Sequence, residues 1–310
     1  MRILFMGTPD FAIPTLDQLI KRGHDIVGVV TQPDKPQGRH MTLTPPPVKK
    51  FALGAGLEVY QPETLKNEAF KAELEKMAPD IIVVVAYGKI LPEYILNYPR
   101  LGCVNLHGSI LPKYRGAAPM QRAIMNGEDE VGATVMYMEK GLDTGDMLSV
   151  LKFKLEDDMN LEYVHDRLST QGAVLLADTV ENMTQGQKGI PQNDEEFTYA
   201  AKIEKDDLVL SFELDARSLH NKVRGLSPVP LTYAVLNGKK IKFKRTVIAE
   251  ESSDNPQDYG KICEISSKGI KILCRKGSVY LTHLVPEGKK PMDSGAFVNG
   301  RGCGVGDIFE

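Results

Sequence analysis

Short runs of β-branched and other apolar residues alternate with helix-like segments over the first half of the chain, and this alternation constrains the fold more than any other feature. The runs lie at residues 2–6, 25–31, 80–86, 103–107 and 133–139. Helical patterns lie between them, at residues 15–23 and 66–77. Strands that alternate with helices are typical of βαβ units. We therefore predict an α/β fold with a mostly parallel sheet.

The second half of the chain has a different pattern. Apolar residues recur at helical spacing over residues 160–185, which predicts a long helix. Residues 187–207 follow with Gly, Pro and a run of charges but little periodicity, which indicates a linker. A second domain should then begin near Leu208, with a helical segment followed by short strands at residues 231–236, 240–249, 261–266, 269–275 and 278–285. Five short strands joined by tight turns favour a small β-barrel such as an OB-fold.

Composition agrees with a globular protein of two domains. The chain has 310 residues, of which 42% are hydrophobic and 25% are charged. No uninterrupted apolar stretch approaches the roughly 18 residues of a membrane span, and the N-terminus lacks the apolar region and cleavage site of a signal peptide. We expect a cytoplasmic protein that does not cross a membrane.

Several common cofactor motifs are missing. The four cysteines form no CxxC pair, so neither a zinc ribbon nor a disulfide framework is indicated. Pro9 and Phe11 stand where a GxGxxG sequence after the first strand would need glycines, so an NAD fingerprint is absent. We expect neither NAD nor a metal ion.

One segment combines polar side chains with the end of a predicted strand. Residues 103–119 read CVNLHGSILPKYRGAAP and pass from the strand into a loop rich in Gly and Pro. Residues i and i+2 of a strand share a face, so Asn105 and His107 should point toward one site at the carboxyl edge of the sheet. A carboxamide beside an imidazole can hold an oxyanion. An isolated pair of this kind more often only satisfies the polar end of a strand.

A carboxylate in a second segment is a candidate partner of this pair. Residues 141–147, GLDTGDM, place Asp143 in a turn flanked by glycine after the predicted strand at 133–139. A carboxylate near His107 would orient the imidazole ring and favour its charged form. Asp143 and Asp146 are equally consistent with turn residues that cap their own backbone.

A long basic loop is a candidate contact for an anionic partner. Residues 32–50 form a proline-rich stretch that carries Lys35 and Arg39. Loops longer than about 12 residues are often functional. A basic loop beside a catalytic cleft would suit RNA, although a solvated insertion is an equally weighted interpretation.

The C-terminal part of the chain is its basic half. Residues 208–310 carry a formal charge of +5, against −8 for residues 1–207. In the predicted strand KKIKFKR at 239–245, alternate apolar residues would face the core while Lys242 and Lys244 face outward. Such a face suits a phosphate backbone, although it is also what a merely solvated strand looks like.

Four segments together resemble the folate-dependent formyltransferase family. They are FMGTPDFA at 5–12, PDKPQGR at 33–39, NLHGSILPKYRGAAP at 105–119 and GLDTGDM at 141–147. The third segment is typical of the whole family, whereas PDKPQGR and the TGD that follows Asp143 resemble its tRNA-directed branch. The resemblance extends along the whole chain.

The resemblance implies an activity and a domain plan. The activity is transfer of the formyl group of 10-formyltetrahydrofolate to the α-amino group of methionine on initiator methionyl-tRNA, for translation initiation. The plan is a Rossmann-like catalytic domain over 1–188, a linker over 189–207 and an OB-like tRNA-binding domain over 208–310. We expect a monomer that needs no metal.

The resemblance also implies roles for individual residues. By their place in the motifs, the catalytic residues are Asn105, His107 and Asp143. The tetrahydrofolate-binding segment falls on Ser109, Ile110, Leu111 and Pro112. Arg39 falls on the basic residue of a loop that contacts tRNA, and we expect further tRNA contacts from Lys35, Lys242 and Lys244.

Two other functions compete with this one. A sibling formyltransferase that acts on the amine of a sugar nucleotide would share the catalytic core and can carry a small C-terminal domain. A noncatalytic RNA-binding protein with a decayed α/β domain would keep the basic strands but would have no use for folate.

Overall fold

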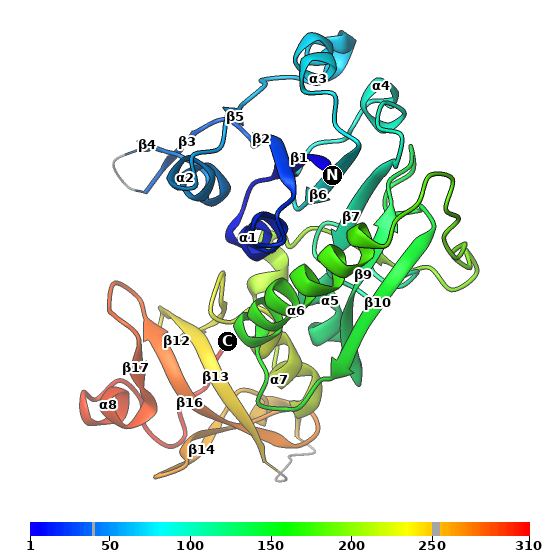
Figure 1. Ribbon diagram of the computed structural model, residues 1–310. Helices are drawn as coiled ribbons and strands as arrows, with labels where there is room; N and C mark the ends of the chain where they lie inside the picture. Colours follow the sequence, from blue (N-terminus) through cyan, green and yellow to red (C-terminus); the bar gives the residue numbers. More distant parts are fainter. Residues whose placement is uncertain (39–40, 250–254) are drawn as a thin grey trace. The chain divides into compact units, whose positions relative to one another are not determined.

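The computed structural model describes residues 1–38, 41–249 and 255–310 (Figure 1). The chain folds into two compact units. The first unit comprises Met1–Gly116, Gly132–Phe153 and His165–Tyr199. The second comprises Ala117–Val131, Lys154–Val164 and Ala200–Glu310. Each unit therefore draws on more than one stretch of the sequence.

A seven-stranded sheet forms the centre of the first unit. Its strand order is β10-β9-β7-β6-β1-β2-β5. The neighbours β7/β6, β6/β1, β1/β2 and β2/β5 are parallel, whereas β9 is antiparallel to β7. The predicted α/β fold with a mostly parallel sheet is confirmed. The strands are β1 (Arg2–Gly7), β2 (Asp25–Val30), β5 (Val59–Tyr60), β6 (Ile81–Val85), β7 (Cys103–His107), β9 (Glu130–Tyr137) and β10 (Met147–Lys154).

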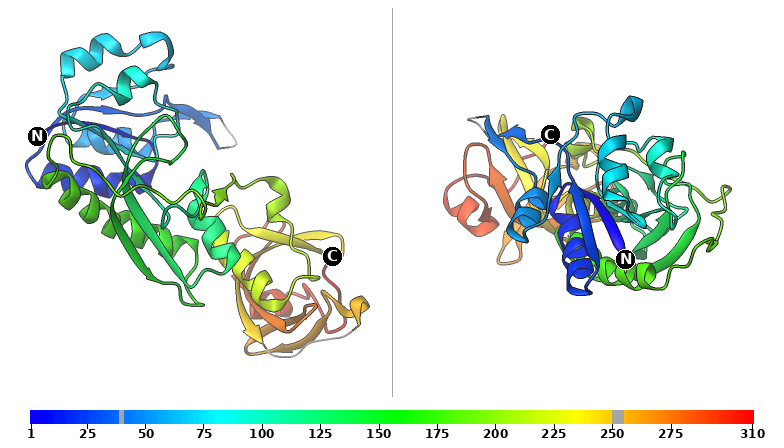
Figure 2. Two further views of the ribbon diagram at one scale, coloured as in Figure 1. Left: turned by 90° about the vertical axis from the view of Figure 1, so that its right-hand side faces the viewer. Right: turned by 45° about the horizontal axis from the view of Figure 1, so that its top comes forward.

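Helices cover both faces of this sheet. The views agree that α1 (Ile13–Lys21) and α6 (Leu161–Glu181) lie on one face and that α3 (Lys71–Met77) and α4 (Glu93–Leu96) lie on the other (Figures 1 and 2). Successive side chains of a strand point to opposite faces of the sheet, so each face has its own core. Leu4 and Met6 of β1 pack in the cluster that also contains residues of α3 and α4. The guanidinium of Arg22 ties α1 to α6 through carboxylates near the end of α6.

Several predicted elements of the first unit are confirmed and two are corrected. The five predicted strands and the long helix are present. The predicted helix at 66–77 is wrong in its first half, because Asn67 and Glu68 have φ of 53° and 55° and interrupt the helical path. A 3-10 turn, η2 (Lys66–Glu68), and α3 take its place.

The long loop predicted at 32–50 contains regular elements in its described residues. It contains the hairpin of β3 (Lys35–Gln37) and β4 (Thr42–Thr44) and the start of α2 (Pro47–Gly54). Pro47 stands at the first position of α2, where a helix needs no backbone donor, so a proline-rich approach and a helix start are compatible. Short elements elsewhere are η1 (Asp10–Ala12), β8 (Arg115–Gly116) and β11 (Tyr199–Ala200).

The second unit is built on antiparallel strands. The sheet order is β12-β13-β16-β15-β14, with β17 paired to β16. Residues 306–310 then pair with both edges: Val235 of β12 exchanges backbone hydrogen bonds with Glu310, and the N–H of Ile262 donates to the carbonyl of Asp307. The final residues thereby close the sheet into a small barrel. The strands are β12 (Thr232–Leu236), β13 (Lys239–Ala249), β14 (Ile262–Ser266), β15 (Gly269–Leu273), β16 (Ser278–Pro286) and β17 (Met292–Asp293).

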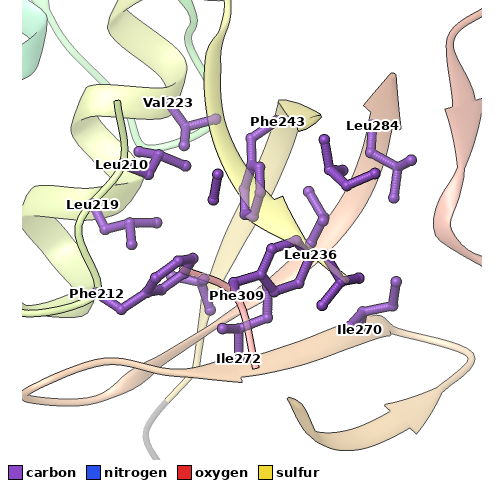
Figure 3. Close-up of a cluster of buried hydrophobic side chains, with 14 of the residues drawn as sticks. Leu210, Phe212, Leu219, Val223, Leu236, Phe243, Ile270, Ile272, Leu284 and Phe309 are labelled. Atoms are coloured by element: carbon purple, nitrogen blue, oxygen red, sulfur yellow. The ribbon is translucent and has the colours of Figure 1, made fainter. Parts of the chain in front are cut away.

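Aromatic side chains fill the centre of this barrel. Phe212, Phe243 and Phe309 lie with ring centroids 5.3 to 6.2 Å apart (Figure 3). Helix α7 (Ala216–Gly225) adds Leu219 and Val223 to the same cluster. Helix α5 (Pro119–Asn126) packs on α7, and the unit also contains η3 (Lys205–Leu208), η4 (Pro256–Asp258) and α8 (Ser294–Asn299).

Candidate active site

Strand β7 carries the two polar residues that the sequence singled out. All five residues of β7 are buried, and Asn105 and His107 are 9% and 6% exposed. Their spacing places both side chains on one face of the sheet, at the end of the strand. Among the residues that the structure describes, none forms a hydrogen bond with the carboxamide of Asn105. A buried polar group without a protein partner is suited to receive a ligand.

The ring of His107 is oriented by a backbone carbonyl. Its Nε2 atom lies 2.9 Å from the carbonyl oxygen of Tyr114. A carbonyl only accepts, so Nε2 carries the proton of this hydrogen bond. Nδ1 lies 3.7 Å from Oδ2 of Asp143. The two ring nitrogens of His107 thus face two acceptors, the carbonyl of Tyr114 and the carboxylate of Asp143.

Asp143 is held in a sharp turn. Its φ of 53° lies in the left-handed region, which aspartate tolerates better than most residues do. The backbone N–H of Gly116 donates to its Oδ2 atom at 2.8 Å. Asp143 therefore lies in a turn and faces His107, while its carboxylate accepts from Gly116, which is distant in the sequence and outside its own turn.

The direction of β9 makes this proximity unexpected. Because β9 is antiparallel to β7, Tyr137 at its end lies opposite Val104, while His107 lies opposite Thr134. Residues 138–146 must therefore return along β7 to bring Asp143 to His107. Gly145 permits this return, because a Cβ atom there would overlap the carbonyl oxygen of Tyr137.

The loop after β7 is fixed by one buried threonine. Thr134, which is fully buried, donates from Oγ1 to the carbonyl of Ser109 and accepts from the N–H of Leu111. The Oγ atom of Ser109 donates to the carbonyl of Lys113 at 2.7 Å. Ile110 and Pro112 are half-buried and keep part of their apolar surface free. The segment is thus a rigid edge that directly follows the polar pair.

Gln192, in the predicted linker, contacts the turn that contains Asp143. Gln192 donates from Nε2 to the carbonyls of Asp143 and Gly145, at 2.9 and 2.8 Å. Its Oε1 atom accepts from Nε of Arg115 at 2.9 Å. The sequence analysis missed Gln192, because it lies in a stretch without periodicity or motif.

The neighbouring thiol offers no alternative nucleophile. Cys103 begins the same strand and is 1% exposed. Burial raises the pKa of its thiol to about 12, so the thiolate is not formed at neutral pH. The amide, the imidazole and the carboxylate remain the candidate groups for chemistry at this strand end.

The predicted tRNA contacts fall in different parts of the chain. Arg39 lies outside the described residues. Lys35 belongs to the first unit, where its Nζ atom donates to Oε1 of Gln32 at 2.6 Å. Lys242 and Lys244 belong to β13 in the second unit, and they are exposed and half-buried respectively. Between them Phe243 is buried, as the alternation in the sequence predicted.

Two further observations concern the described residues alone. No helix among them is long and apolar enough to cross a membrane. Within the same residues, no group of three or more His, Cys, Asp or Glu side chains could hold a metal ion.

A mostly parallel sheet that gathers a buried amide, a buried imidazole and a half-buried carboxylate beside one strand end is typical of α/β enzymes. Residues 1–180 match the family model described as formyl transferase, and residues 202–302 match the one described as formyl transferase, C-terminal domain. The chain belongs to the formyl transferase family.

Individual relatives extend over the whole chain. The methionyl-tRNA formyltransferase of Macrococcus caseolyticus is 44% identical over 300 residues, which are 96% of this chain and 95% of that protein. The solved methionyl-tRNA formyltransferase of Clostridium thermocellum superposes with a TM-score of 0.56 at 16% identity, over 80% of this chain and 93% of that one. The structure of WlaRD, a sugar 3N-formyl transferase, superposes with a TM-score of 0.65 at 18% identity, over 94% and 99% of the two chains. At these identities the two structures show a shared fold.

Proposed function

We propose that this protein transfers the formyl group of 10-formyltetrahydrofolate to the α-amino group of methionine on initiator methionyl-tRNA. The observation that carries the proposal is the approach of Asp143 to His107 beside Asn105, within a chain that is 44% identical to a methionyl-tRNA formyltransferase. The catalytic residues proposed are Asn105, His107 and Asp143.

The acceptor determines what the protein must supply. An α-amino group titrates near about 7.7 to 8.0, and an ester on the same residue lowers this further, so the amine is largely neutral at physiological pH. The amine can attack a formyl carbon without a strong base. What the reaction needs is a donor for the oxygen that becomes negative and a path for one proton.

Asn105 and His107 would supply the donors. The carboxamide of Asn105 has no competing protein partner among the described residues, so its N–H group is available to the oxygen. The hydrogen bond from Nε2 to Tyr114 fixes the ring of His107. The 3.7 Å gap between Nδ1 and Asp143 exceeds hydrogen-bond length, so an N–H group at Nδ1 of a protonated ring would be free for the same oxygen.

Asp143 would manage charge and the proton. Its carboxylate, 3.7 Å from Nδ1 of His107, would offset a positive charge on the ring. As the amine nitrogen bonds to the formyl carbon it must lose one proton, and the departing N10 nitrogen must gain one when its bond to that carbon breaks. Asp143, directly or through a water, would accept the first proton and return it to N10.

The formyl donor would lie against the loop that follows β7. Folate supplies the activated one-carbon unit, and Ser109, Ile110, Leu111 and Pro112 are the residues that we expect to bind it. The loop suits a flat ligand, because Thr134 holds its backbone while Ile110 and Pro112 keep apolar surface free. No metal is needed for this chemistry.

The tRNA would be held by basic residues of both units. We propose contacts from Lys35 and Arg39 in the first unit and from Lys242 and Lys244 in the second. The domain roles would follow the predicted plan, with catalysis in 1–188, a linker over 189–207 and tRNA binding in an OB-like domain over 208–310. The protein would act as a monomer in the cytoplasm.

An acceptor comparison tests the proposal. Purified protein is mixed with 10-formyltetrahydrofolate and one of three acceptors: methionyl-tRNA, free methionine or a dTDP-linked amino sugar. We expect rapid formylation of methionyl-tRNA only. Formylation of the amino sugar instead would show that the acceptor is a sugar nucleotide and not methionyl-tRNA. Absence of both folate binding and formyl transfer would contradict the proposal that the protein is a formyltransferase.

A further inference from the structure

We propose that Gln192 is a positioning residue that holds Asp143 against His107. This inference rests on the proposed function, because it concerns the same site. It goes beyond the proposed catalytic residues, since Gln192 lies outside the motifs that point to the site and acts through Asp143.

Gln192 contacts a turn whose shape needs support from its surroundings. Asp143 has a φ of 53°, a conformation that costs free energy unless its surroundings maintain it. The single amide of Gln192 bonds the carbonyls on both sides of Thr144, at 2.9 Å to Asp143 and 2.8 Å to Gly145. Two bonds from one rigid amide fix the spacing of these carbonyls and hence the turn.

Gln192 is itself anchored by a neighbouring side chain. Its Oε1 atom accepts from Nε of Arg115, whose side chain is 8% exposed. A second nitrogen of Arg115 pairs with Asp194 at 2.7 Å, and its guanidinium lies 5.3 Å from the ring centroid of Phe197. An amide whose oxygen is held by a buried guanidinium presents its two N–H groups in one orientation only.

The chain segment that contains Arg115 also holds the carboxylate of Asp143. Gly116 follows Arg115, and its N–H donates to Oδ2 of Asp143, the oxygen nearest His107. Gln192 thus fixes the backbone of Asp143, while the residue after its anchor fixes the carboxylate. The network holds a carboxylate at a 3.7 Å distance from His107 in the free protein.

The variant Gln192→Met tests this role, because methionine keeps the length of the side chain and removes the donors. The matched control is Gln171→Met, an exposed glutamine of α6. We expect Gln192→Met to lower kcat roughly 10-fold, because the turn that carries Asp143 loses both bonds to the amide, with little change in KM. We also expect faster amide hydrogen exchange over residues 139–146 in this variant and not in the control.

A double variant separates positioning from a general structural role. If Gln192 acts through Asp143, adding Gln192→Met to Asp143→Asn should cause no further loss of kcat. A further 10-fold loss in the double variant, or unchanged exchange over 139–146, would overturn the inference. If Gln192→Met does not fold, Gln192→Glu serves, because it keeps the acceptor for Arg115 while replacing the donors.

The outcomes remain distinct from those that concern the proposed function. If Asp143→Asn transfers formyl groups as fast as the unmodified protein, the role proposed for Asp143 fails. The hydrogen-exchange comparison would still decide whether Gln192 holds the turn.

Discussion

Nδ1 of His107 and Oδ2 of Asp143 lie 3.7 Å apart although β9, which leads to Asp143, ends at the far end of β7 from His107. The loop that returns between them therefore brings a carboxylate near the ring. We expect Asp143→Asn to lower kcat by about 100-fold or more, because the proposed proton acceptor and its negative charge are both lost. Steady-state kinetics with methionyl-tRNA measure this.

The control for that experiment is Asp146→Asn in the same loop. Its backbone carbonyl accepts from Tyr137, but no contact between its carboxylate and His107 is present among the described residues. A comparable loss of kcat in Asp146→Asn would mean that the loop, and not the carboxylate at position 143, carries the effect.

The barrel of the second unit depends on its last residues. Phe309 is 2% exposed and stacks with Phe212 and Phe243 (Figure 3). We expect Phe309→Ala to lower the free energy of unfolding by about 3–5 kcal/mol, since it removes buried surface and leaves a cavity. Urea unfolding followed by circular dichroism measures the change. Val305→Ala, at a side chain that is 65% exposed, should cost less than about 0.5 kcal/mol.

A buried histidine should make stability depend on pH. Nδ1 of His220 contacts the hydroxyl of Thr246, and Nε2 contacts the carbonyl of Asp157. Burial lowers the pKa of His220, and Arg224 acts in the same direction. The unfolded chain, with a histidine pKa near about 6.5, then binds more protons than the folded one as the pH falls.

The lowered pKa of His220 sets the direction in which stability changes with pH. The contribution of His220 to stability is present above pH of about 6.5 and is lost as the pH falls below it. The melting temperature should therefore drop between pH 7.5 and pH 5.5, and the drop should be smaller in His220→Gln. His283→Gln, at an exposed position, should keep the full drop. An equal drop in His220→Gln would contradict the assignment.

The proposed tRNA contacts predict a dependence on salt. Lys242 is exposed and Lys244 half-buried on β13. Each phosphate contact contributes roughly 1 to the slope of log K against log salt, so Lys242→Ala with Lys244→Ala should reduce the slope by about 2. Lys66→Ala with Lys76→Ala, at exposed positions of the first unit, is the control. An unchanged slope in the first pair would remove these lysines from the interface.

Much of the fold could be predicted because its signals are local. The strand β6 is buried along its whole length and therefore reads as a continuous apolar run. The break at Asn67 and the hairpin at 35–44 were missed, because a positive φ and a short pairing between polar residues leave little mark in a sequence. The final segment at 306–310 has no strand pattern, and its role in closing the barrel comes from pairing with distant residues.

The site was predictable only in part, for the same reason. Asn105 and His107 are two residues apart on one strand, so their shared face follows from the geometry of the strand. Asp143 reaches them through an antiparallel strand and a returning loop, which no spacing rule predicts. Gln192 contacts that loop from 49 residues further along the chain. For Asp143 the residues suggested a candidate partner of His107, and the family resemblance implied its catalytic role.

The central claim is that Asn105 helps to carry the oxyanion in formyl transfer. Its most direct test is the single-turnover rate of formyl transfer to methionyl-tRNA by Asn105→Ala, beside an Asn193→Ala control at an exposed position. Loss of one oxyanion donor predicts a rate roughly 100-fold to 1000-fold lower, with folding and the affinity for tRNA retained. A rate equal to that of the unmodified protein would contradict the account.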